Sequence, residues 1–135
     1  MPSSRLQEVL DRGEAECFPT RKHAGGLTAA LASFGLKPDP SGLSQVTRAE
    51  AIEILVALLS AGMAYGESRV PEAEAPSLAE EILLMISTAP KVIYSNGNWA
   101  RHKGWNPMTD STFDSGLVVE SEQDEYGCVW FRDED

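Results

Sequence analysis

The chain has 135 residues, 42% of them hydrophobic, which is typical of a single domain (1–135) with a core of its own. Its 21 acidic residues against 11 lysines and arginines give a formal net charge of −10. Nucleic acid and anionic membranes repel such a chain, so direct binding to either is not expected. Basic protein surfaces are the favoured partners.

The two cysteines, Cys17 and Cys128, lie far apart in the sequence and form no CxxC motif. A disulfide between them is one reading, and two reduced cytosolic thiols are the preferred one. The first residues, MPSSRLQEVLDRGE, lack the apolar core of a signal peptide. We therefore expect a cytoplasmic protein.

The N-terminal part reads as short helices joined by polar segments. Ser3 or Ser4 is suited to cap a helix that ends near Gly13, and residues 14–22 form a polar connector broken by a proline. A second helix is predicted from about residue 20 or 26 to Phe34, where Gly35 suits a C-terminal cap. Residues 37–42 (KPDPSG) predict a rigid turn.

The longest predicted helix spans residues 47–65, and the fold is expected to form around it. Thr47 and Glu50 form a capping box at its start. Apolar residues cover nearly its whole circumference, with Leu55 and Leu59 expected to be almost fully buried. Such a helix is buried in a domain or spans a membrane, and its charge-free run is too short to span.

A third helix and a set of strands follow. Residues 67–76 are an acidic connector, and Ser77 with Glu80 form a second capping box, opening a helix that ends by Pro90. Strands are predicted at 91–95, 116–120 and 126–132. Asn96-Gly97 is a turn signal, residues 98–114 a long loop with a short strand at its start, and residues 121–125 a charged turn.

These elements predict an α+β fold. An N-terminal layer of three to four helices (about 1–89) packs on a small C-terminal antiparallel β-meander (about 91–132).

Acidic residues are concentrated near the C-terminus. Residues 1–70 carry eight acids against seven bases, whereas residues 110–135 carry nine acids and Arg132 as the one base. One interpretation is a solvated turn and a charged tail; the other is a negative surface that steers a basic partner. The acids of this candidate surface are Asp110, Asp114, Glu120, Glu122, Asp124, Glu125, Asp133, Glu134 and Asp135.

Trp99 and Trp105 lie in the long predicted loop and complete the candidate partner-binding set. Tryptophan is enriched in interface hot spots, although a loop tryptophan often anchors its own loop. No nucleophile, phosphate-binding or metal-ligand motif is present, so we expect no enzyme, cofactor or metal site. Asp110 and Asp114 read either as a carboxylate pair or as turn caps.

The segments GWNPMTDSTFDSGLVVE, CVWFRDED and LVALLSAGMAYG resemble small acidic bacterial proteins, in general character the immunity proteins of bacterial toxin systems. The resemblance implies that the protein neutralises a cognate toxin by binding it. A basic, nuclease-type toxin fits an acidic inhibitor that blocks its active site. The alternative is another acidic protein-binding module, such as a regulatory adaptor or a nucleic-acid mimic.

Overall fold

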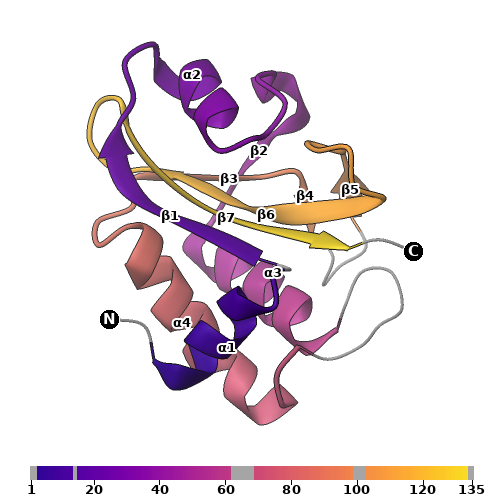
Figure 1. Cartoon of the computed structure of the whole chain (residues 1–135). Coiled ribbons are helices and arrows are strands. Elements are labelled where there is room, and N and C mark those ends of the chain that lie inside the picture. Colours follow the sequence, from indigo (N-terminus) through magenta and orange to yellow (C-terminus); the bar gives the residue numbers. More distant parts are fainter. Residues whose placement is uncertain (1–2, 14, 62–68, 99–102, 134–135) are drawn as a thin grey trace.

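A five-stranded antiparallel sheet lies between two layers of helices (Figure 1). The structure is a computed structural model that describes residues 3–13, 15–61, 69–98 and 103–133. Within them the helices are α1 (Ser4–Asp11), α2 (Gly26–Ser33), α3 (Arg48–Ser60) and α4 (Ala75–Ile86), with short 3-10 turns at Pro40–Gly42 and Glu72–Glu74. The strands are β1 (Ala15–Lys22), β2 (Ser44–Val46), β3 (Val92–Ser95), β4 (Gly97–Asn98), β5 (Lys103–Trp105), β6 (Phe113–Glu120) and β7 (Glu125–Asp133).

The sheet has the strand order β1-β7-β6-β3-β2, and β4 and β5 form a separate hairpin. Strands β3, β6 and β7 make the predicted C-terminal meander. Glu120 pairs with Tyr126 and Gly116 with Trp130, which confirms the predicted pairing of 116–120 with 126–132.

Helices α1, α3 and α4 cover one face of the sheet and α2 covers the other (Figure 1). Leu117 and Val119 of β6 join the core under α3 and α4, whereas Val118 between them joins the core under α2. This alternation follows from the two-residue period of a strand, and it lets one strand supply both cores. The predicted α+β class is confirmed, with α2 on the face opposite the other helices.

Helix α3 begins as predicted. Thr47 accepts a hydrogen bond from the Glu50 backbone, and Glu50 reaches back to Thr47, so the capping box is formed. Leu55 and Leu59 are fully buried. The helix ends at Ser60, because Ala61 adopts an extended backbone, so it is shorter than predicted. Residues 62–65 of the predicted helix lie outside the described residues.

Two strands lie in the part that was predicted to be helical. The predicted connector 14–22 is instead largely strand β1, and β2 follows the Pro40–Gly42 turn. β1 is an edge strand whose pairing with β7 shifts register between Phe18 and Arg21, around Pro19. Proline is tolerated at such edges and bulges because its missing N–H leaves no central ladder bond unmade.

Two local predictions are wrong. Helix α4 begins at Ala75, with Pro76 in its first turn and no side-chain cap, so Ser77 and Glu80 form no capping box. Proline fits a first turn because that N–H has no helical acceptor. Asn96-Gly97 closes no hairpin: Gly97 starts β4 and pairs with Trp105.

Candidate functional site

The acids of the predicted surface lie at three separate positions in the fold. Glu120, Glu122, Asp124 and Glu125 lie at the β6–β7 turn, Asp110 is exposed in the loop before β6, and Asp133 lies at the far end of β7. From the antiparallel pairing of 116–120 with 126–132 we expected the turn and the tail to frame one edge of the sheet. Strand β7 instead runs between β1 and β6, so it is not an edge strand. Trp99, Glu134 and Asp135 lie outside the described residues, as does the Trp105 side chain, whose backbone is in β5.

Asp114 does not belong to an exposed surface, because it is completely buried. Its carboxylate accepts hydrogen bonds from Trp130 Nε1 (3.1 Å), the backbone N–H groups of Met108 (3.0 Å) and Thr109 (3.0 Å), and the Thr109 hydroxyl (2.9 Å). A buried carboxylate requires such donors. Asp114 therefore ties the loop before β6 to the core under α2.

Asp133 is also engaged within the molecule. Its Oδ1 lies 2.5 Å from Nη2 of Arg69, which is almost fully buried. The Arg69 guanidinium also donates to the Leu58 carbonyl and lies 5.2 Å from the centre of the Phe131 ring. This ion pair joins the end of β7 to the segment after α3, so the predicted role of Asp133 as a steering charge does not fit its position.

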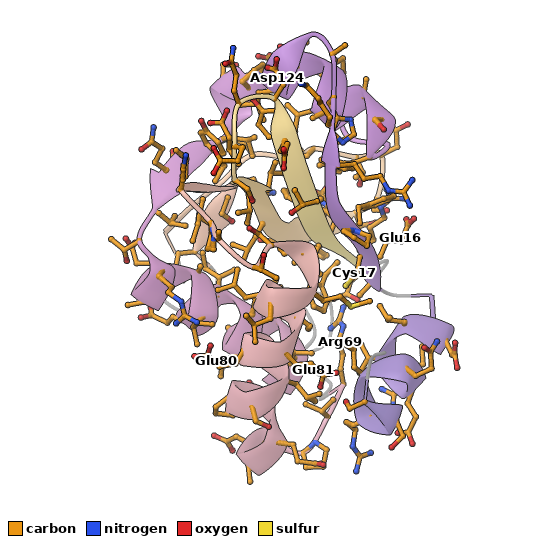
Figure 2. All side chains as sticks on the ribbon, turned by 90° about the vertical axis from the view of Figure 1, so that its left-hand side faces the viewer. Glu16, Cys17, Arg69, Glu80, Glu81 and Asp124 are labelled. Atoms are coloured by element: carbon orange, nitrogen blue, oxygen red, sulfur yellow. The ribbon has the colours of Figure 1, made fainter. Side chains whose placement is uncertain are left out.

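Two acids of the β6–β7 turn point toward the α2 side. Glu120 accepts a hydrogen bond from the Tyr126 hydroxyl (3.1 Å), and burial together with this bond raises the pKa of Tyr126 to about 12. Asp124 has φ of 62°, and its carbonyl accepts the His23 N–H (2.7 Å). Figure 2 shows Asp124 at the end of the sheet beside α2, where a carboxylate suits the helix N-terminus.

Glu122 and Glu125 lie on the α4 side, where they line a hollow of about 310 Å³. We call this the turn hollow; its lining residues are Thr20, Leu84, Met85, Ser87, Thr88, Ala89, Ser121, Glu122 and Glu125. Glu122 forms an exposed ion pair with Lys91 (2.9 Å). The Glu125 carboxylate makes no hydrogen bond or ion pair with the part of the chain that the structure describes.

The wall of the turn hollow is tightly connected. The Ser87 and Ser121 hydroxyls are 2.5 Å apart, which joins the end of α4 to the turn. The Thr20 hydroxyl of β1 donates to the Ile86 carbonyl. Gly127 allows this approach, because a Cβ there would overlap the same carbonyl oxygen. Three elements therefore meet at one packed seam.

Leu84 is the functional candidate that sequence reasoning missed. It is 58% exposed, the large hydrophobic side chain left open to solvent within the described residues. Residues 82–86 are all apolar, yet Ile82, Leu83 and Ile86 are buried and Leu84 falls off that stripe. Helical spacing alone could have identified it as an apolar residue facing away from the core.

The described residues present little reactive chemistry. Burial raises the pKa of the Cys17 thiol to about 12 and raises that of Cys128 well above its ordinary value. Both cysteines are free, and they pack against opposite faces of the sheet. Among these residues no group of three histidine, cysteine or acidic side chains is placed to hold a metal ion, and no helix is long and apolar enough to cross a membrane.

Comparisons of the chain with protein-family models, with curated proteins and with solved structures find no match.

Proposed function

We propose that this chain is a toxin-neutralising immunity protein, acting in the bacterial cytoplasm, that binds a basic toxin and blocks its active site. The observation that carries the proposal is the turn hollow. There, two carboxylates and an exposed leucine line one hollow beside the packed seam. An apolar anchor beside rim charges is the composition of a protein-binding surface.

The pairing of the other acids supports this location. On the helices, Glu74 pairs with Arg5, Glu80 with Arg48, and Glu81 accepts from Ser3. Figure 2 shows Glu80 and Glu81 on either side of α4. Each of these carboxylates accepts from a donor within the chain, whereas the Glu125 carboxylate has no such donor among the described residues. A partner can therefore supply the donor that this carboxylate lacks.

The mechanism is steric and electrostatic. The net charge of −10 attracts a basic toxin and raises its rate of encounter with the inhibitor. Nuclease-type toxins carry basic surfaces because their substrate is polyanionic. An inhibitor bound to such a surface excludes the nucleic acid because it contacts the same basic residues.

The test combines capture with rescue. The tagged full chain is used to capture proteins from its native bacterium, and each captured protein is then expressed alone and together with the chain. The proposal predicts a basic protein that arrests growth alone and is tolerated in co-expression. Capture of non-toxic partners only would contradict it and would favour the adaptor class.

A further inference from the structure

We infer that the turn hollow is the docking site for an arginine of the partner that has an apolar residue beside it. This inference rests on the proposed function and specifies its contact. The opening lies between the C-terminal end of α4 and the β6–β7 turn, and about 310 Å³ is at the small end of the range for binding pockets. Such a space suits one long side chain better than a larger ligand.

The charge of the hollow favours a cation. Glu122 and Glu125 supply two carboxylates on the turn side. On the opposite side, α4 ends without a basic residue in its last turn, and the Thr20 hydroxyl is the neutral donor to its Ile86 carbonyl, so the negative end of the helix dipole meets no cation of the helix itself. A guanidinium has five N–H donors in a planar fork, which match carboxylate and carbonyl acceptors better than an ammonium does.

The Lys91–Glu122 ion pair does not close the site. Both side chains are more than half exposed. Exposed pairs of this kind contribute little to stability, so an incoming arginine readily replaces the lysine.

The hollow also has an apolar component. Leu84 presents an exposed side chain at the same place, next to the partly buried Met85. An arginine side chain has an aliphatic stem, which packs on apolar surface while its head reaches the carboxylates. A neighbouring apolar residue of the partner would cover Leu84, which explains why that leucine is left open.

The seam holds the groups in place before binding. The two walls are connected by the Ser87–Ser121 contact and by the close approach of Gly127 to the end of α4. The Ala89 N–H donates to the Ser87 hydroxyl, which holds the segment after α4. A preorganised site loses little conformational entropy when it is occupied.

The experiment uses the isotope-labelled full chain and blocked tripeptides followed by NMR. The probe is N-acetyl-Leu-Arg-Leu-amide, with N-acetyl-Leu-Glu-Leu-amide as the charge-reversed control. The inference predicts saturable amide shifts at residues 84–89 and 121–125 with the arginine peptide and none with the glutamate peptide. Glu125→Gln and Leu84→Ala should each weaken binding by about tenfold.

Asp110→Asn is the matched control, because it removes an exposed acid at the opposite end of β6 and should leave peptide binding unchanged. Shifts elsewhere on the molecule, equal shifts with both peptides, or no saturable shifts would overturn the inference. The proposed function has a separate outcome. If Leu84→Ala and Glu125→Gln bind the captured toxin as tightly as the parent does, the docking site is wrong and neutralisation stands; if no toxin is found, the function is wrong.

Discussion

Leu55 lies at the centre of α3 and is completely buried, whereas Leu84 on α4 is 58% exposed. The same substitution at these two positions therefore separates the effect of burial from the effect of replacing a leucine. Leu55→Ala should lower the free energy of unfolding by about 2–5 kcal/mol, because it removes buried methyl groups and leaves a cavity. Leu84→Ala should change it by less than about 0.5 kcal/mol.

Urea unfolding of both variants gives the two values directly. Equal losses would mean that the face of α3 bearing Leu55 is no more buried than the surface of α4.

Asp114 is a second residue with a sharply defined role. Asp114→Asn keeps the shape but replaces one of the two acceptor oxygens by an NH₂ group. That group faces either Trp130 Nε1, at the Oδ1 position, or the Thr109 N–H, at the Oδ2 position. Leaving a buried donor without an acceptor costs about 1–3 kcal/mol. The loss should appear in urea unfolding and as a change in Trp130 fluorescence, whereas Asp110→Asn at an exposed position should show neither. A stable Asp114→Asn with unchanged fluorescence would show that the network does not hold the loop.

At the scale of elements, strong local signals were sufficient for part of the fold. The Thr47–Glu50 capping box located the start of α3, and short continuous apolar runs located β6 and β7. β1 was missed because it is a polar edge strand with a proline, so neither period nor propensity marks it. β1 forms because it pairs with β7, and this pairing joins residues that are far apart in the sequence.

Gly127 makes the packing of α4 against β7 testable. A Cβ at this position would overlap the Ile86 carbonyl oxygen, which is backbone and has little freedom to move. Gly127→Ala should therefore separate α4 from the sheet and lower the free energy of unfolding by about 1–3 kcal/mol or more. Glu125→Ala, two residues earlier on β7, is the control and should stay close to the parent. A thermal unfolding series compares them, and a Gly127→Ala midpoint equal to that of Glu125→Ala would contradict this packing.

For the whole molecule, the sequence predicted the excess of acidic residues near the C-terminus. It did not predict which of these acids are buried or paired and which line the turn hollow. Asp114 and Asp133 became internal partners, and Asp124 came to lie beside α2, because burial and neighbours depend on the tertiary fold. Of the predicted acids, Glu122 and Glu125 are the two that line the turn hollow, together with Leu84 of α4 and Ser87 at its C-terminal end. The sequence alone could not predict that the end of α4 lies beside the β6–β7 turn.

Buried neutral groups should make the fold labile at high pH. The pKa of Cys17 is raised from 9.0 to about 12 by burial, and that of Tyr126 from 10.0 to about 12 by burial and Glu120. The unfolded chain therefore releases these protons first. The stability that they contribute is complete below about pH 9 and is lost as pH rises toward 12.

Each such group contributes a slope of up to about 1.4 kcal/mol per pH unit in that window. Urea unfolding between pH 8 and pH 11 measures the fall, and Cys17→Ala should make it shallower. A free energy of unfolding that does not change over this range would show that the thiol and the phenol are not held neutral in the fold.

The most direct test of the central claim measures association with the captured basic toxin by stopped flow, at low and at moderate salt. The Glu122→Gln, Glu125→Gln double variant removes the carboxylates of the turn hollow and leaves Asp124 beside α2; Asp110→Asn is the control. The account predicts slower association and a weaker salt dependence for the double variant, with unchanged unfolding and an unchanged control. An association rate and salt response equal to those of the parent would show that the turn hollow does not receive the toxin.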